Sequence, residues 1–259
     1  MSAAPIFDLS GRTALITGAS SGLGAHFATI LAAAGANVVL AARRKNNLDA
    51  LCAQIISVGG KAIAVAMDVA DEASTIAAYD AAEAAFGTVD TVIANAGISN
   101  PPAQMTDLPI ADFDQVMDVN LRGVFLTVRE GAKRLIASGS REKENGRVVI
   151  ISSLAALHVS AGLAAYAASK AGVLHLGKVL ARDWVRMGIN VNMICPGYVK
   201  TEINAAWFES EGGQKTIAAM HRRRLMDGGD LDVPLLYLAS DASRAVTGTF
   251  ISVDDGQSL

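Results

Sequence analysis

The sequence has few cysteines, few aromatic residues and no excess of positive charge. Its 259 residues include two cysteines, Cys52 and Cys195, which lie far apart and show no metal-ligand spacing, so we expect two buried, reduced thiols and no disulfide framework. Aromatic residues make up 5% of the chain and hydrophobic residues 51%, so Ala, Val, Ile and Leu must fill the core. The 22 Lys and Arg against 25 Asp and Glu argue against a basic surface for nucleic acid or an anionic membrane.

Metal-binding, membrane-spanning and secretory features are also missing. No cluster of His, Cys and carboxylates has metal-ligand spacing. Two stretches without charge, Thr13–Ala42 and Val148–Ser169, are interrupted by Gly, Ser, Thr, His or Asn, which is not typical of a lipid-facing helix. Met1–Arg12 has no basic segment followed by an apolar one, so no secretory signal is expected. The sequence predicts a soluble, cytoplasmic protein.

Short β-branched runs alternate with longer Ala-rich runs along the chain. The candidate strands are Thr13–Thr17, Asn37–Ala42, Ala62–Asp68, Thr91–Asn95, Arg147–Ser152, Asn190–Ile194 and Thr249–Val253. The candidate helices lie near Leu23–Ala34, Asn46–Val58, Glu72–Phe86, Ala111–Ser138, Ala164–Met187 and Leu231–Ser240. Most strand runs are continuously apolar, as expected for parallel strands covered on both faces. The pattern predicts right-handed βαβ units and one doubly wound α/β domain over residues 1–259.

Two segments interrupt this alternation. Ser138–Asn145 is charged and rich in small residues, so we expect a solvated surface loop. Tyr198–Gly228 is a long connection, which predicts a lid over a site. Its Trp207 and Phe208 are consistent with a cover over an apolar substrate or with lid-to-core packing. Its basic run His221–Arg224 is consistent with attraction of an acidic substrate or with a solvated face.

Three glycines follow the first candidate strand and open the first candidate helix. Gly18, Gly22 and Gly24 have the spacing Gly-x-x-x-Gly-x-Gly. A helix N-terminus binds phosphate through its free N–H groups and its dipole, and glycine lets the backbone approach a pyrophosphate. A tight strand-to-helix turn is the alternative, but three glycines in seven positions favour a dinucleotide site.

The tip of the second candidate strand bears on the choice of cofactor. An acidic residue at this place accepts from the ribose 2′-hydroxyl of NAD, whereas Arg accommodates the 2′-phosphate of NADP. Here Ala42 is followed by Arg43 and Arg44. Because a guanidinium bonds two phosphate oxygens at once, the sequence favours NADP over NAD, although a solvated pair at a helix start remains an alternative.

A tyrosine and a lysine one helical turn apart suggest acid–base chemistry. Tyr166 and Lys170 share a helix face, and a nearby ammonium lowers the pKa of a phenol toward the range useful at neutral pH. Such a pair alone is also common as a surface contact. Ser153 strengthens the case, because it follows the fifth candidate strand, where a hydroxyl can face a ligand crevice.

Together, the glycine motif, Asn95-Ala96-Gly97, Asn120, Ser153, Tyr166, Lys170 and Pro196-Gly197 stand in the order found in the short-chain dehydrogenase/reductase family. The chain resembles that family from about Arg12 to Gly256. The resemblance implies a Rossmann-type domain with a mostly parallel sheet of about seven strands, and hydride transfer between NAD(P) and a carbonyl or alcohol. It implies a catalytic set of Asn120, Ser153, Tyr166 and Lys170, in which Asn120 anchors a water that carries protons from Lys170.

The resemblance also implies which residues contact the cofactor. These are Gly18, Ser20, Ser21, Gly22, Leu23, Gly24, Arg43, Arg44, Asp68, Val69, Asn95, Gly97, Tyr166, Lys170, Pro196, Gly197, Val199 and Thr201. The chain departs from the family at Ala94, where a second Asn is usual, and at Ser21, where some NADP-using members have a basic residue. The second departure leaves the NADP preference resting on Arg43 and Arg44. Subunit contacts through Leu231–Ser240 and Thr249–Val253 imply a homotetramer or a homodimer.

Three functions are consistent with these features. The first is an NADP(H)-dependent carbonyl or 3-oxoacyl reductase acting on a small-molecule ketone, although the charge-balanced run Arg141–Glu144 argues against a carrier-protein client. The second is an NAD(H)-dependent alcohol, sugar or steroid dehydrogenase. The third is a dinucleotide sensor or scaffold without turnover. Such a protein has no need of the complete Asn-Ser-Tyr-Lys set, so the presence of that set argues against this function.

Overall fold

Parallel strands form one sheet in the order β3-β2-β1-β4-β5-β6-β7 in the computed structural model, which describes residues 7–201 and 204–259. The strands are β1 (Thr13–Thr17), β2 (Asn37–Ala42), β3 (Lys61–Ala66), β4 (Thr91–Ala94), β5 (Gly146–Ile151), β6 (Ile189–Pro196) and β7 (Phe250–Val253). The chain builds from β1 outward to β3, returns to β4, and then builds outward to β7. The connection therefore changes direction between β1 and β4, and in such sheets a ligand crevice opens there, at the carboxyl ends of the strands.

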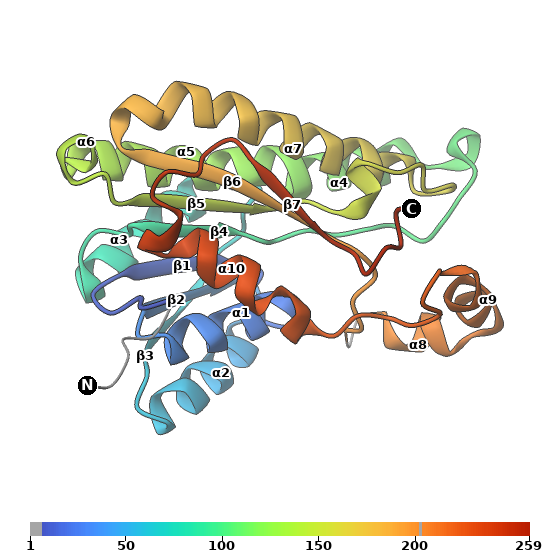
Figure 1. The fold of residues 1–259 in the computed structure, drawn as a ribbon, viewed down its shortest axis with the longest axis horizontal. Helices are drawn as coiled ribbons and strands as arrows, with labels where there is room; N and C mark the ends of the chain where they lie inside the picture. The colour runs from blue at the N-terminus through green and yellow to red at the C-terminus, as the bar shows by residue number, and fades with distance from the viewer. Residues whose placement is uncertain (1–6, 202–203) are drawn as a thin grey trace.

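Helices cover both faces of this sheet (Figure 1). Their bounds are α1 (Gly22–Ala33), α2 (Lys45–Ser57), α3 (Glu72–Phe86), α4 (Ile110–Met117), α5 (Gly123–Ala137), α6 (Ser140–Lys143), α7 (Ala164–Trp184), α8 (Ala205–Glu209), α9 (Glu211–Ala219) and α10 (Asp232–Ala239). Residues of α3, α5 and α7 fill one hydrophobic cluster, and residues of α1, α2 and α10 fill the other. The doubly wound α/β fold expected from the sequence is confirmed.

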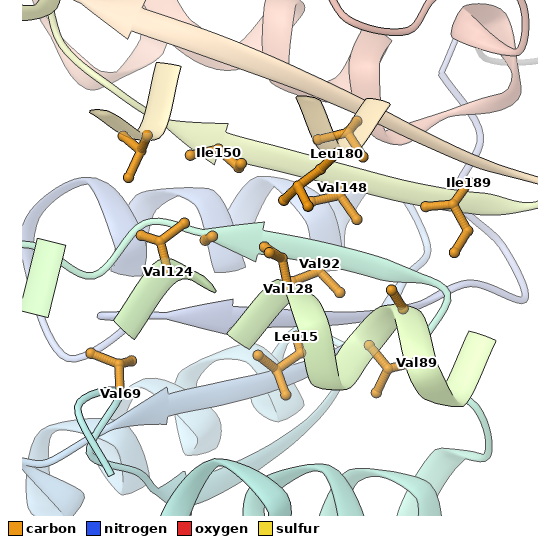
Figure 2. Packing of buried hydrophobic residues seen from close by; sticks show 14 of the residues in the cluster. Leu15, Val69, Val89, Val92, Val124, Val128, Val148, Ile150, Leu180 and Ile189 are labelled. Atoms are coloured by element: carbon orange, nitrogen blue, oxygen red, sulfur yellow. The ribbon is translucent and has the colours of Figure 1, made fainter. Parts of the chain in front are cut away.

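Apolar residues alternate between the two clusters along each central strand. In β5, Val148 and Ile150 belong to the cluster under α5 and α7, whereas Val149 and Ile151 belong to the opposite one. Figure 2 shows Val124 and Val128 of α5 packed near strand residues of the first cluster. Since both faces are covered, most positions of such a strand are apolar, which explains why these runs lack polar alternation.

The predicted strands were found with ends that match or differ by one or two residues, and the long helix predicted near Ala111–Ser138 is present as a continuous helical segment over residues 110–137. It is divided into α4, a π-helical turn at Asp118–Arg122, and α5. Asn120 lies in that turn and is fully buried. A π-helical turn holds one extra residue, so it shifts which side chains face inward on either side of it.

The segment Ser138–Asn145 is not the solvated loop that its composition predicts. It contains α6, and Ser140 is buried, with its hydroxyl donating to the carbonyl of Met187 at 2.6 Å. A Cβ at Gly188 would lie 1.9 Å from the Ser140 carbonyl oxygen, so the two segments are in close contact. The charged side chains of α6 remain exposed, which is why composition alone indicated a free loop.

The segment 198–228 contains α8 and α9, which project from one end of the molecule (Figure 1). Its two ends are joined, because the Met226 N–H donates to the Tyr198 carbonyl at 3.0 Å and the Lys200 N–H donates to the Met226 carbonyl at 2.9 Å. Residues 202 and 203 of the predicted lid lie outside the described residues. The basic run is partly neutralised, since Arg222 and Arg224 both pair with Asp255.

In the described part of the chain, no helix has the length and the apolar character needed to cross a membrane.

Candidate active site

A cavity of about 480 Å³ opens at the carboxyl ends of β1 to β4. Most of the predicted cofactor residues line it, namely Gly18, Ser20, Ser21, Gly22, Leu23, Gly24, Arg43, Arg44, Asp68, Val69, Asn95, Gly97 and Thr201. Pro196 and Gly197 are not among the residues that line this cavity, and they lie at the end of β6. The side chain of Val199 is buried in the cluster under α1 and α10, so only its backbone could contact a ligand. Segments from distant parts of the sequence thus meet where the sheet topology predicts a crevice.

The glycine turn can be built only without side chains at two of its positions. A Cβ at Gly24 would lie 2.3 Å from the Gly18 carbonyl oxygen and 2.7 Å from the Asn95 amide nitrogen. Gly18 itself has φ +70° and approaches the Ala96 backbone. The Asn95 side chain donates to the Thr17 carbonyl at 2.9 Å, which fixes the end of β4 to the end of β1. The first turn of α1 therefore faces the cavity with an open backbone, and this cradle fits the pyrophosphate of a dinucleotide.

Arg44 lies beside the glycine turn. Its guanidinium donates to the Ser20 hydroxyl at 3.0 Å and to the Ser21 hydroxyl at 2.6 Å. Arg43 is exposed next to it, and β2 ends at Ala42 as predicted. A guanidinium and two hydroxyls at one end of the cavity form a set of donors that suits a phosphate group.

The loop after β3 forms another wall of the cavity. The Asp68 carboxylate accepts from the Ala70 N–H at 3.0 Å, so one of its oxygens stabilises its own turn. Val69 is buried, and a Cβ at Gly123 would lie 2.8 Å from its Cγ2 atom. Gly123 therefore lets α5 approach this loop closely.

Ser153, Tyr166 and Lys170 come together beside the Gly97 end of the cavity. The Ser153 hydroxyl lies close enough to the Tyr166 phenol to lower its pKa. The Lys170 ammonium lies 5.7 Å from the centre of the Tyr166 ring. A Cβ at Gly97 would be only 3.3 Å from the Lys170 Nζ atom, so Lys170 reaches the cavity wall.

The electrostatics of this group differ from the sequence expectation. Burial is the largest effect on Tyr166 and raises its pKa, and the neighbouring Tyr198 raises it further. The Lys170 Nζ atom donates to the Ile151 carbonyl at 2.9 Å, and burial lowers the pKa of Lys170 to about 8. The spacing of Tyr166 and Lys170 predicts that the lysine lowers the tyrosine pKa, whereas in the structure Ser153 is the group that lowers it and burial has the larger, opposite effect.

Asn120 connects the turn between α4 and α5 to the segment after β4 and to α7. Its amide nitrogen donates to the Ile98 carbonyl at 2.8 Å and to the Ser169 hydroxyl at 3.0 Å, and its oxygen accepts from the Ile98 N–H at 2.8 Å. Ser169 in turn donates to the Tyr166 carbonyl at 2.7 Å. These contacts connect Asn120 through Ser169 to the main chain of Tyr166, while the predicted water relay stays a prediction.

Replacing Asn120 with Ala should lower the free energy of unfolding by about 3 kcal/mol, because it removes three buried hydrogen bonds and leaves their partners unpaired. Urea unfolding at pH 7 measures this change. Ser169→Ala removes only the last link of the chain and should cost less than half as much. Equal stability of Asn120→Ala and the parent would show that these hydrogen bonds do not hold the turn.

Sequence reasoning missed several residues at this end of the sheet. Thr17 accepts from the N–H groups of Asn95 and Ala96 at 3.0 Å, and its place at the end of β1 could have indicated this. Tyr198 acts on the Tyr166 pKa and packs edge-on against Phe208 at 5.7 Å, and its position directly after Pro196-Gly197 is a usable signal. Gln257 accepts from the Tyr198 N–H at 2.7 Å, and nothing in the sequence indicates this contact.

A family model described as short chain dehydrogenase matches residues 12–212. D-threitol dehydrogenase of Mycolicibacterium smegmatis is 34% identical over 254 residues, which cover 98% of this chain and 95% of that protein. Cis-4-hydroxycyclohexanecarboxylate dehydrogenase of Sinomonas cyclohexanicum is 34% identical, covering 95% of this chain and 96% of that protein.

Solved structures agree with these relatives. A short-chain type dehydrogenase/reductase from Mycobacterium marinum superposes with a TM-score of 0.90 at 33% identity, covering 98% of both chains. A candidate 2-deoxy-D-gluconate 3-dehydrogenase from Agrobacterium tumefaciens, solved with bound NADP, has a TM-score of 0.86 at 38% identity, covering 97% of this chain and 98% of that one.

Proposed function

Because the chain belongs to the short-chain dehydrogenase family, we propose that it transfers a hydride between NADP(H) and a small ketone or secondary alcohol, with Ser153, Tyr166 and Lys170 as catalytic residues. The family assignment makes the chain an oxidoreductase of CH–OH groups that uses a nicotinamide dinucleotide. The observation that carries the proposed residue roles is that Tyr166 has Lys170 beside its ring and Ser153 close enough to lower its pKa, with Lys170 in contact with the Gly97 end of the cavity.

The proposed mechanism assigns one task to each side chain. In reduction, Ser153 donates a hydrogen bond to the carbonyl oxygen, and the Tyr166 hydroxyl transfers its proton to that oxygen. In oxidation, the Tyr166 phenolate accepts the proton of the alcohol. When protonated, Lys170 offsets the negative charge of that phenolate, and Asn120 holds the main chain of Tyr166 through Ser169. The bound dinucleotide supplies or accepts the hydride.

Steady-state assays with NADPH and NADH against a panel of ketones and secondary alcohols test this proposal. We expect turnover of at least one small substrate, faster with the phosphorylated cofactor. Cofactor binding without any turnover would favour the sensor or scaffold alternative, and faster turnover with NADH would favour the NAD(H)-dependent dehydrogenase.

The proposed preference for NADP rests on Arg44 more than on Arg43. Arg44→Ala removes the guanidinium beside Ser20 and Ser21, so the dissociation constant for NADPH should rise about tenfold or more, while that for NADH changes much less. Arg43→Ala is the matched control and should have the smaller effect. Fluorescence titration with both cofactors measures the four constants, and equal losses for NADPH and NADH in Arg44→Ala would overturn the preference.

The 3-oxoacyl reductase version of the proposal has less support than a small-molecule reductase or dehydrogenase. A carrier-protein client needs a basic surface, but the α6 charges are balanced and Arg222 and Arg224 share the Asp255 carboxylate. The names of the relatives refer to small alcohols. We therefore propose a small-molecule substrate.

Assembly and location stay predictions. Support for a homotetramer or homodimer comes from β7, which within the described part of the chain pairs only with β6 and leaves Phe250 exposed at the edge of the sheet. An edge strand with an exposed aromatic residue is suited to contact with a second copy. We propose that the assembled enzyme is cytoplasmic, on the basis of the reduced cysteines expected from the sequence.

A further inference from the structure

The last residue of β5 and the two residues that follow it all lie beside the proposed catalytic pair. Ile151 ends the strand, and its carbonyl accepts from the Lys170 Nζ atom at 2.9 Å. Ser152 is next, and its hydroxyl donates to the Lys170 carbonyl at 2.9 Å. Ser153 follows and lies close to the Tyr166 phenol. One short piece of chain therefore contacts Lys170 at its main chain and at its ammonium, and reaches Tyr166 as well.

The contact between Ser152 and Lys170 is not one that helix formation requires. The Lys170 carbonyl lies inside α7, where the N–H four residues further along already bonds to it. Its second lone pair accepts from the Ser152 hydroxyl. Only 3% of the Ser152 surface and 4% of the Lys170 surface is exposed, so this hydrogen bond is shielded from water. Because a buried hydroxyl is costly unless it is hydrogen-bonded, Ser152 is held to this carbonyl.

Apolar packing holds α7 against the sheet, and the Ser152 hydrogen bond adds a directional contact. A Cβ at Gly177 would lie 2.3 Å from the Met193 Sδ atom and 3.4 Å from the Ile150 Cδ1 atom, so the helix lies directly on β5 and β6. Apolar contacts of this kind have no preferred direction. A hydrogen bond has a preferred distance and angle, so the Ser152 hydroxyl defines where the Lys170 main chain lies relative to the end of β5.

Ser152 is itself fixed by the sheet. Its N–H donates to the Ile194 carbonyl at 2.8 Å, which continues the pairing of β5 with β6 by one residue. Two parallel strands therefore set the position of Ser152, and Ser152 connects them to α7 at Lys170. Because Ser152 is buried and is not among the residues that line the cavity at the ends of β1 to β4, we expect it to act on the reaction through Lys170.

We propose that Ser152 is a positioning residue for the proposed reaction, which holds the main chain of Lys170 so that its ammonium stays beside the Tyr166 ring. The ammonium lies 5.7 Å from the centre of that ring and is bonded to the Ile151 carbonyl. Without the Ser152 hydroxyl, this turn of α7 can shift, and the ammonium loses the fixed place from which it offsets the charge of the phenolate. A small displacement of a group at a reacting centre is enough to lower the rate of the chemical step. This inference rests on the proposed roles of Tyr166 and Lys170.

Two variants that each lose one oxygen, Ser152→Ala and Ser140→Ala, test this role. Each removes a buried hydroxyl that donates to a main-chain carbonyl, but Ser140 bonds to Met187 at 2.6 Å, next to the amino end of β6 and away from the site. Acetic anhydride under mildly alkaline conditions, followed by peptide mass spectrometry, measures how fast Lys170 is acetylated relative to the exposed Lys178. We expect this ratio to rise about fivefold in Ser152→Ala, which corresponds to the loss of one hydrogen bond of ordinary strength, and to stay within about twofold of the parent in Ser140→Ala.

Steady-state kinetics of the same two variants test the connection to the reaction. The kcat of Ser152→Ala should fall about fivefold to tenfold while KM stays within about twofold of the parent, because substrate still binds while the ammonium is displaced. Ser140→Ala should keep the kcat of the parent. A purely structural role of Ser152 would reduce the amount of folded protein and leave kcat per folded molecule unchanged.

Two results would overturn the inference. The acetylation ratio could rise equally in both variants or in neither, which would show that Ser152 has no local hold on Lys170. Alternatively, the ratio could rise in Ser152→Ala while kcat stays at the parent value, which would show that this hold does not matter for turnover. If the parent turns over none of the alcohols and ketones, the proposed function fails, and the acetylation ratio still decides whether Ser152 positions Lys170.

Discussion

Replacing Tyr166 with Phe should lower kcat by about a hundredfold or more with every substrate that the parent turns over. The change removes one oxygen, which is the proposed proton donor and acceptor, and general acid–base catalysis typically contributes about 10²–10⁴-fold. Because the ring remains, its packing near Lys170 is kept. Steady-state rates give kcat, and fluorescence titration should show NADPH binding close to that of the parent.

Tyr198→Phe is the matched control for this result. It removes a second phenol from the same end of the sheet, one that transfers no proton in the proposed mechanism. Its loss in kcat should be far smaller than that of Tyr166→Phe. Near-normal turnover by Tyr166→Phe, or an equal loss in both variants, would remove Tyr166 from its proposed role.

Replacing Lys170 with Met should change how stability depends on pH as well as abolish most turnover. The pKa of Lys170 falls to about 8 in the folded chain from an ordinary value of 10.5, because burial disfavours the ammonium. Between these two pH values the unfolded chain binds more protons than the folded one, so the free energy of unfolding of the parent rises with pH. Below about pH 8 Lys170 is protonated in the folded chain, so the folded state carries the full free-energy cost of burying that charge.

Lys170→Met removes this penalty, so its stability relative to the parent should be greatest near pH 7 and should decline by about 3 kcal/mol by pH 10.5. The lost hydrogen bond to Ile151 adds a cost that does not vary with pH in this range. Urea unfolding of both proteins at several pH values measures the difference. Lys178→Met, at an exposed position of the same helix, should follow the pH dependence of the parent. A constant difference between Lys170→Met and the parent would contradict the lowered pKa.

Local sequence patterns were sufficient for the fold and for the geometry of the glycine turn. The apolar runs of β1 and β5 indicated buried parallel strands because each of their residues packs on one face or the other. The spacing of Gly18 and Gly24 could be interpreted because the helix start and the preceding turn are neighbours in sequence as well as in space. Both features depend on contacts within a short stretch of chain.

Features that depend on long-range contacts could not be predicted in this way. The π-helical turn at Asn120 lies within a continuous helical segment, and the contacts that it makes become visible only through Ile98 and Ser169. Spacing places Lys170 near Tyr166 but does not show that its ammonium bonds to Ile151. The contact between Gln257 and Tyr198 spans 59 positions, and no local motif marks either partner for the other.

The close fit between Gly24 and the Gly18 carbonyl limits how this protein could be re-engineered to use a different coenzyme. A methyl group at Gly24 would lie 2.3 Å from the Gly18 carbonyl oxygen, so this position of the turn cannot accept a side chain. Arg43 and Arg44 are exposed and can be replaced without disturbing the sheet. Directed evolution of coenzyme choice should therefore begin with the tip of β2 and leave the glycine turn as it is.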